Sequence, residues 1–242
     1  MVSARVSFEH HPPDQLVQAL ASDIAGRLQA AISQRGQAVL VVSGGKSPVA
    51  LFEALRVMPL HWQQISISLA DERCVTNDHP DSNAFLVRRH LLKAQAAAAR
   101  LLPLIADQTP LAAPVQLARS ATRVLLALGQ ADVLVLGMGT DGHIASLFPQ
   151  AANLPLAMDL MQTPACLAME MSDLPANAPY PRLSQNLSML LNTRHIVLPV
   201  TGADKLAVLH RAHLGPSLKL PVSKLLHQDR APVAVWLTKE ND

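Results

Sequence analysis

Short apolar runs alternate with helical segments along most of this chain. The runs are rich in leucine and β-branched residues, and they span residues 38–42, 65–69, 133–136, 195–200 and 232–237, with helical segments at residues 49–56, 82–92, 115–128 and 203–211. Such runs are typical of strands buried on both faces of a parallel sheet. The alternation therefore predicts an α/β fold, a three-layer, mainly parallel, Rossmann-like sheet with helices on both faces.

One long helix is expected before the first of these strands. Leu16, Leu20, Ile24, Leu28 and Ile32 recur every four residues, which places them on one face of an α-helix. The chain has 242 residues, of which 50% are hydrophobic, so it is long enough to bury a large core without a second domain. We therefore expect a single α/β domain over residues 1–242.

Charge and cysteine content argue against several functional classes. The net charge is +2 and the basic residues are scattered, so no nucleic-acid partner is expected. Charged residues and histidines precede any long apolar run, which argues against a secretory signal or membrane anchor and for a cytoplasmic location. Cys74 and Cys166 are too few for a disulfide framework or a cysteine-rich zinc site, and there is no HExxH motif. We expect no metal and no cofactor.

The stretch 131–149, ADVLVLGMGTDGHIASLFP, is the most informative motif. The apolar run stops at glycines, which permit positive φ and a close approach of a ligand to backbone N–H groups at the end of the strand. Asp141 and His143 follow directly, so we expect the imidazole at the edge of a cleft. Gly137, Gly139 and Gly142 match a GxGxxG pattern, but Pro149 leaves no room for the helix that a dinucleotide fingerprint requires.

The loop at residues 43–48 is a candidate anion site. It combines glycines, hydroxyls and a cation ahead of a helix N-terminus, in the residues Ser43, Gly44, Gly45, Lys46 and Ser47. Backbone N–H groups and positive potential at such a place suit a phosphate. The spacing is not that of a nucleotide P-loop, and a tight structural turn is the alternative.

Further charged residues follow other predicted strands or lie in loops. Asp71, Glu72 and Arg73 end the second strand, Arg182 lies in a proline-bearing segment, and Lys205 begins a helix. Each also has a structural alternative without function. The triplet could form a local ion pair or a helix cap, Arg182 could be an exposed loop arginine, and Lys205 could be a solvated surface lysine.

Together these pieces resemble the 6-phosphogluconolactonase family, within the wider group that includes glucosamine-6-phosphate deaminase. Residues 43–48 (SGGKSP) resemble the SGG-containing phosphate loop of the family, although Lys46-Ser47 departs from the more common Ser-Thr pair. Asp71-Glu72-Arg73 resembles its DER motif, and residues 137–149 resemble its GxGxDGHxASLFP signature. Arg182 and the segment 202–205 fall where the family carries phosphate-facing basic residues.

The resemblance implies metal-free hydrolysis of 6-phospho-D-glucono-1,5-lactone to 6-phospho-D-gluconate, in the oxidative pentose phosphate pathway, by a monomer or small homo-oligomer. His143 is then the general base, Asp141 orients it, and Arg73 stabilises the oxyanion. Asp71 and Glu72 organise Arg73 or contact sugar hydroxyls. The residues that bind the phosphate are then Ser43, Gly44, Gly45, Lys46, Ser47, Arg182 and Lys205.

Two other functions remain open at this point. The deaminase loop typically continues GHIAFNEP, whereas this chain has Phe148 at the acidic position, and a phenyl ring cannot exchange a proton. A non-catalytic sugar-phosphate sensor is the second alternative. Sensors of this group that regulate transcription carry a DNA-binding module, and none is evident before residue 38.

Overall fold

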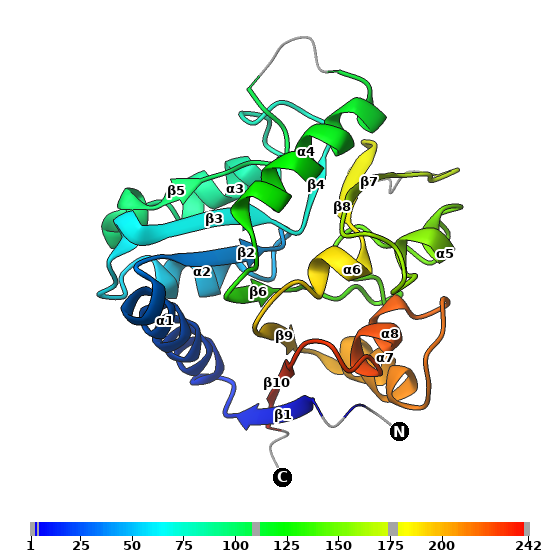
Figure 1. Cartoon of the computed structure of the whole chain (residues 1–242). Helices are drawn as coiled ribbons and strands as arrows, with labels where there is room; N and C mark the ends of the chain where they lie inside the picture. Colours follow the sequence, from blue (N-terminus) through cyan, green and yellow to red (C-terminus); the bar gives the residue numbers. More distant parts are fainter. Residues whose placement is uncertain (1–2, 4, 108–111, 174–178, 240–242) are drawn as a thin grey trace.

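The computed structural model describes residues 3, 5–107, 112–173 and 179–239. Its centre is a seven-stranded sheet in the order β1-β10-β9-β6-β2-β3-β5, and every pairing in it is parallel (Figure 1). The strands are β1 (Val6–His11), β2 (Ala38–Val42), β3 (Ile65–Leu69), β5 (Arg100–Leu101), β6 (Val133–Val135), β9 (Ile196–Val200) and β10 (Val233–Thr238). The predicted α/β fold with a mainly parallel sheet is confirmed.

Helices cover the sheet on both faces. They are α1 (Leu16–Arg35), α2 (Val49–Leu55), α3 (Asn83–His90), α4 (Pro114–Leu128), α5 (Leu154–Ala157), α6 (Leu187–Leu190), α7 (Ala203–His213) and α8 (Pro221–Leu226), with 3₁₀ turns η1 (Trp62–Gln64) and η2 (Ala94–Ala98). One hydrophobic core contains buried apolar residues of α1 to α4, and a second contains most of those of α5 to α8. In the described part of the chain, no helix is both long and apolar enough to cross a membrane.

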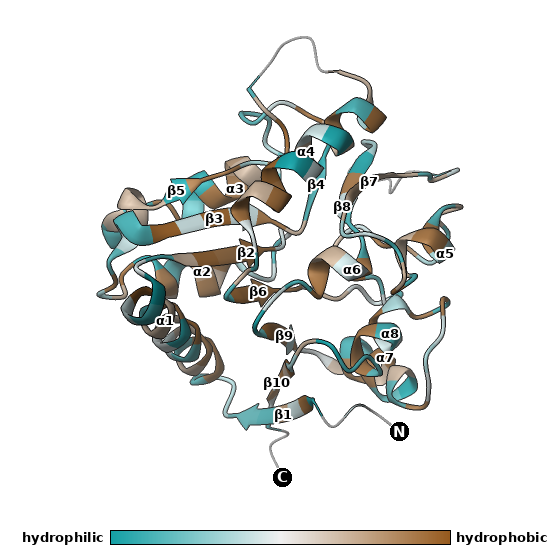
Figure 2. Cartoon of the chain, in the orientation of Figure 1, coloured by the Kyte–Doolittle hydropathy of each residue, from teal (hydrophilic) through white to brown (hydrophobic). Residues whose placement is uncertain are grey.

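The strand sequences explain why two cores form. In β2, Ala38, Leu40 and Val42 belong to the first core, whereas Val39 and Val41 belong to the second. Successive side chains of a strand point to opposite faces, so a strand between two helical layers needs apolar residues at every position. Figure 2 shows the result, with β2 hydrophobic throughout and the edge strand β1 largely hydrophilic.

The first helix follows the predicted spacing. Leu16, Leu20, Ile24, Leu28 and Ile32 are all buried along one face of α1. The helix continues to Arg35 and ends at Gly36, whose φ of 74° is left-handed and whose N–H bonds to the carbonyl of Ile32. A glycine adopts this conformation without the steric cost of a Cβ.

The sequence did not reveal β1. This strand pairs with β10 alone, at the edge of the sheet, and carries the exposed polar residues Ser7 and His10. His11 at its end stacks on Trp236, with 4.8 Å between the ring centroids. An edge strand buries one face only, so it lacks the continuous apolar run that marks the central strands.

A second, antiparallel sheet was also missed. It has the order β4-β8-β7 and consists of β4 (Asp71–Arg73), β8 (Arg182–Gln185) and β7 (Cys166–Met169). The DER triplet is therefore a strand rather than a loop, and Arg182 is a strand residue with 4% of its surface exposed rather than an exposed loop arginine. β4 and β8 are strands because their backbones pair with each other across more than a hundred positions, and local sequence does not carry that information.

Candidate functional site

A cavity of about 290 Å³ opens at the carboxyl ends of three neighbouring strands, β2, β3 and β6. Parallel sheets place their ligands at such ends. The cavity is lined by Ser43, Gly44, Gly45, Ser47, Asp71, Arg73, Asn83, Gly137, Met138, Gly139, His143, Ala145, Ser146, Phe148, Arg182 and Lys205. The three segments that the sequence places after separate strands thus meet in one site.

His143 is held by Asp141 in the loop after β6. The Asp141 carboxylate lies 2.5 Å from Nδ1 of the imidazole and accepts a hydrogen bond from the His143 backbone N–H at 3.1 Å. Partial burial raises the pKa of Asp141, but the hydrogen bond and charge of His143 outweigh burial and keep that pKa below its usual value. Because a carboxylate only accepts, Nδ1 carries the proton and a neutral imidazole keeps Nε2 free to accept one.

Glycine is required where this loop folds back on itself. A Cβ at Gly139 would lie 2.3 Å from the imidazole of His143, so only glycine leaves space for the ring. Gly142 has a φ of 80°, and a Cβ there would lie 2.9 Å from the Leu220 side chain. The glycines therefore serve the packing of the histidine, and no helix follows them before α5.

Phe148 covers the imidazole from within the same loop. Its ring centroid lies 4.3 Å from that of His143, at an interplanar angle of 39°, and only 8% of its surface is exposed. Between them, Ala145 adopts a φ of 49°, an uncommon conformation for a residue with a side chain. An apolar ring therefore stands beside the histidine where the deaminase motif carries an acid.

Asp71 joins this loop to the second sheet. One carboxylate oxygen accepts a hydrogen bond from Ser146 Oγ at 2.6 Å, and the other lies 3.4 Å from Asn83 Nδ2. Asn83 Nδ2 also donates to the Asp71 carbonyl at 2.9 Å. These contacts fix the carboxylate at the cavity wall as an acceptor, which suits sugar hydroxyls.

Two arginines lie side by side in the cavity. Arg73 of β4 and Arg182 of β8 are directly paired in the antiparallel register. Burial lowers the pKa of Arg182, and the like charge of Arg73 lowers it further. Arg73 donates to the carbonyl of Asp81 at 2.5 Å, while its buried Nε has no hydrogen-bond partner among the described residues. The carboxylates of Asp71, Glu72 and Asp81 act on the pKa of Arg182 in the opposite direction, and the adjacent guanidinium groups suit an anion in the cavity.

The 43–48 loop forms another wall. A Cβ at Gly44 would overlap Asn83 Oδ1 at 1.7 Å, so this loop can pack against α3 only with glycine at that position. Gly45 has a φ of 91°. Lys205 Nζ lies 3.4 Å from Ser47 Oγ, which brings the start of α7 to the same wall.

Glu72 does not line the cavity. It is 1% exposed, and its carboxylate accepts hydrogen bonds from the backbone N–H groups of Arg73, Asn83 and Ala84 and from the Ser82 hydroxyl. Burial raises the pKa of Glu72 to about 7, against the opposing effect of the backbone donors. Of the two roles expected for Glu72, contact with sugar hydroxyls does not fit this burial, whereas its carboxylate does bind the Arg73 backbone and also fixes the start of α3.

Most of the other predicted residues line the cavity, and two do not. Those that line it are Ser43, Gly44, Gly45, Ser47, Asp71, Arg73, His143, Arg182 and Lys205. Lys46 is exposed and lies outside the lining, and Asp141 reaches the site through His143. Among the residues with defined positions, no group of three or more His, Cys, Asp or Glu side chains is arranged to hold a metal ion.

Sequence reasoning missed Asn83 and did not single out Ser146. Both line the cavity and both bond to Asp71. Asn83 opens a helix directly after Ser82, where an asparagine is ordinarily interpreted as part of a cap. Its packing against Gly44 depends on the tertiary structure, so no local signal distinguishes the two roles.

Comparison with known proteins agrees with this geometry. The family model of glucosamine-6-phosphate isomerases/6-phosphogluconolactonase matches residues 11–236. A 6-phosphogluconolactonase of Pseudomonas putida is 46% identical over 88% of this chain and 85% of its own length, and one of Pseudomonas aeruginosa is 45% identical over 89% and 87%. The crystal structure of a 6-phosphogluconolactonase from Shewanella baltica is 36% identical, with a TM-score of 0.84, and covers 99% of this chain and 100% of that one.

The resemblance carried by the three motifs is thereby confirmed over nearly the whole sequence. The motifs themselves, at residues 43–48, 71–73 and 137–149, supply most of the cavity wall. This chain belongs to the glucosamine-6-phosphate isomerase/6-phosphogluconolactonase family.

Proposed function

We propose that this chain hydrolyses 6-phospho-D-glucono-1,5-lactone to 6-phospho-D-gluconate, as the second step of the oxidative pentose phosphate pathway in the cytoplasm. The observation that carries the proposal is the Asp141–His143 pair, covered by Phe148, with His143 lining the same cavity as Arg73 and Arg182. The site offers a general base and positive charge that stabilises an anion. The ring of Phe148 occupies the position at which the deaminase motif carries its acidic residue. The names of the relatives that are 45–46% identical support the same reaction.

In the proposed mechanism, His143 Nε2 takes a proton from a water molecule that attacks the lactone carbonyl carbon. Histidine suits this step because imidazole titrates near neutral pH. The tetrahedral oxyanion is stabilised by Arg73. When the bond from the carbonyl carbon to the ring oxygen breaks, the imidazolium returns the proton to that oxygen, and the product is a carboxylic acid that ionises.

The phosphate is held at the other end of the cavity. Ser43, Ser47, the backbone of Gly44 and Gly45, Arg182 and Lys205 form this subsite in the proposal. The Ser43 hydroxyl is buried and has no partner among the described residues, which supports its use as a contact for a phosphate oxygen. Binding energy from the phosphate positions the carbonyl against His143 without taking part in the chemistry.

The test is hydrolysis of freshly generated lactone by purified protein with chelator present, after subtraction of the spontaneous reaction. We expect His143→Ala to lower kcat by about 10²- to 10⁴-fold, the usual contribution of a general base, with a small change in KM. Arg182→Ala and Lys205→Ala should chiefly raise KM. An unchanged kcat in His143→Ala would remove the imidazole from the mechanism.

Two further readouts separate the alternatives. Release of ammonia from glucosamine 6-phosphate would move the chain to the deaminase branch. Binding of 6-phosphogluconate without either activity would indicate a sensor. Rapid hydrolysis without ammonia release supports the lactonase.

A further inference from the structure

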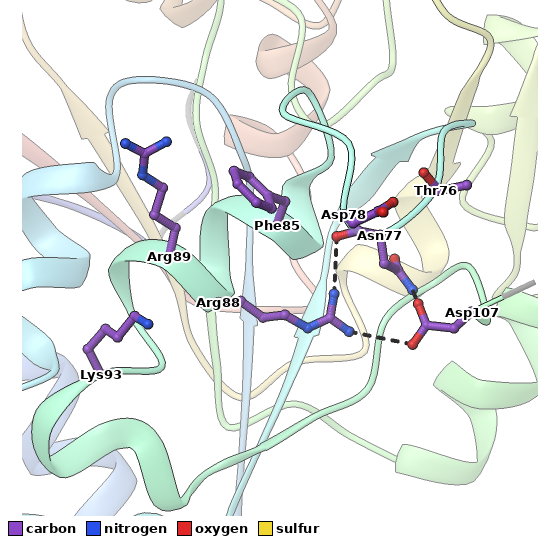
Figure 3. Close-up of a pocket in the computed structure, with 8 residues that line it drawn as sticks. All are labelled: Thr76, Asn77, Asp78, Phe85, Arg88, Arg89, Lys93 and Asp107. Atoms are coloured by element: carbon purple, nitrogen blue, oxygen red, sulfur yellow. Dashed lines mark hydrogen bonds and ion pairs between the residues drawn. The ribbon is translucent and has the colours of Figure 1, made fainter.

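A second pocket lies on α3 outside the catalytic cavity. It has a volume of about 780 Å³ and is lined by Thr76, Asn77, Asp78, Phe85, Arg88, Arg89, Lys93 and Asp107 (Figure 3). It shares no lining residue with the catalytic cavity, although α3 contributes Asn83 to that cavity. The volume is within the range of small-molecule sites, and the proposed reaction uses none of these residues.

The cations of the pocket are not equivalent. Arg88 donates to the carbonyl of Asn77 at 3.2 Å and lies 3.9 Å from the Asp107 carboxylate, so its charge is offset within the protein. The side chains of Arg89 and Lys93 are exposed and make no hydrogen bond or ion pair with any described residue. Figure 3 shows Arg89 projecting from α3 and Lys93 from the turn after this helix, both on the side away from the Arg88 contacts. Two cations thus remain available to an anion.

An aromatic ring lies on the same side. Phe85 precedes Arg89 by one helical turn, and Figure 3 shows its ring on the side of α3 that carries Arg89. The ring is half-buried and lines the pocket. A partly exposed phenyl ring beside cations offers a planar surface on which a flat ring can stack.

The opposite wall carries acceptors. Asn77 is 4% exposed, and its Nδ2 donates to the Ile105 carbonyl at 2.9 Å and to Asp107 at 2.6 Å. Its Oδ1 is left without a hydrogen-bond partner among the described residues. A hydrogen bond from Thr76 lowers the pKa of Asp78, so that carboxylate is ionised and accepts as well. Acceptors of this kind pair with hydroxyl donors of a ligand.

We propose that this pocket binds a nucleoside phosphate. The phosphate lies between Arg89 and Lys93, the base stacks on Phe85, and the ribose hydroxyls donate to Asp78 and Asn77. A bare phosphate uses only the cations, and a sugar phosphate leaves the ring without a partner. A nucleoside phosphate is the ligand class that uses the cations, the Phe85 ring and the acceptors of the opposite wall together. The proposal does not depend on the catalytic activity of the chain.

The test is calorimetric titration of the purified full chain with ADP, AMP, ribose 5-phosphate and inorganic phosphate. We expect saturable binding of ADP, weaker binding of ribose 5-phosphate and the weakest binding of inorganic phosphate. Arg89→Ala and Lys93→Ala should each weaken ADP binding about tenfold or more, because each removes a charge-assisted contact. Phe85→Leu keeps an apolar side chain and should weaken ADP more than inorganic phosphate.

Two controls locate the site. Arg119→Ala removes an exposed arginine of α4 that lines neither pocket and should leave ADP binding unchanged. Lys205→Ala impairs the proposed phosphate subsite of the catalytic cavity and should also leave ADP binding unchanged. Loss of ADP binding in Lys205→Ala would place the nucleotide in the catalytic cavity and overturn the proposal. So would absent ADP binding, or binding of inorganic phosphate as tight as that of ADP.

Discussion

At the scale of single residues, the hydrogen bond between Ser146 and Asp71 joins two walls of the cavity that contains His143. It links two residues 75 positions apart at 2.6 Å, and the Ser146 backbone N–H bonds to Ser184 Oγ at 3.2 Å. The His143 loop is thereby anchored to the second sheet directly after Ala145, whose φ is positive. We infer that Ser146 positions the loop.

We predict that Ser146→Ala lowers kcat/KM for the lactone about 10- to 100-fold, since small displacements of a catalytic group are costly. It should also lower the free energy of unfolding by about 1–3 kcal/mol, because a buried carboxylate loses a donor. Ser68→Ala is the matched control, since Ser68 is a fully buried serine whose Oγ donates to Leu102 outside the cavity. A similar loss of kcat/KM in both variants would mean a general effect on stability rather than positioning.

At the scale of elements, the start of α3 determines how the DER strand meets the cavity. Glu72 receives backbone hydrogen bonds from both Asn83 and Ala84, so a residue of β4 fixes the first turn of the helix. The same turn carries Asn83 against Gly44. One buried carboxylate therefore sets the relative position of two cavity walls.

The raised pKa of Glu72 makes stability depend on pH. Burial moves the pKa from 4.5 to about 7, so the folded state binds the proton more tightly than the unfolded chain. The stabilisation from the protonated group is complete below pH 4.5 and is lost as the pH rises through about 7. We predict that between pH 4.5 and about 7 the unfolding free energy of the wild type falls by up to about 3 kcal/mol relative to that of Glu72→Gln. Urea unfolding of both proteins at several pH values measures this difference. A pH-independent difference between the two proteins would contradict this.

At the scale of the whole molecule, the end of the sheet opposite the cavity is joined by a buried carboxylate. Asp132, directly before β6, accepts a hydrogen bond from the Val39 N–H at 2.9 Å and forms ion pairs with Arg35 at the end of α1 and with Arg194 before β9. Four segments meet at this residue. Its side chain is 7% exposed, so its charge depends on these partners.

We predict that Asp132→Asn lowers the free energy of unfolding by about 2 kcal/mol, because buried hydrogen bonds to a charged group are lost. Asp23→Asn is the control, since it removes a partly exposed ion pair with Arg27 within α1 and should cost about 1 kcal/mol or less. Urea unfolding measures both. Lactone hydrolysis per folded molecule should stay unchanged in Asp132→Asn, because the residue lies at the other end of β6 from His143, and a loss of kcat would contradict this.

Much of the fold and part of the site could be predicted from the sequence. The central strands were predicted because burial between two helical layers requires an apolar residue at every position. Helix α1 was predicted because its buried face carries an apolar residue at every fourth position. The edge strand β1 and the pairing of β4 with β8 were not, since the partners lie far apart along the chain and these strands lack continuous apolar runs. The four-residue strand β7 was missed as well. The same limit applies to Arg182, which sequence alone could equally place in an exposed loop.

The sequence by itself determined the α/β class, the long first helix and the Asp141–His143 loop, because these depend on local spacing and on glycine. Only the tertiary structure decided the roles of the charged residues. It turned Glu72 away from the cavity, brought Asn83 and Ser146 to Asp71, and set Arg73 beside Arg182. The physical reason is that strand pairing and burial, which join residues distant in sequence, decide whether a charged side chain faces a ligand or the protein interior.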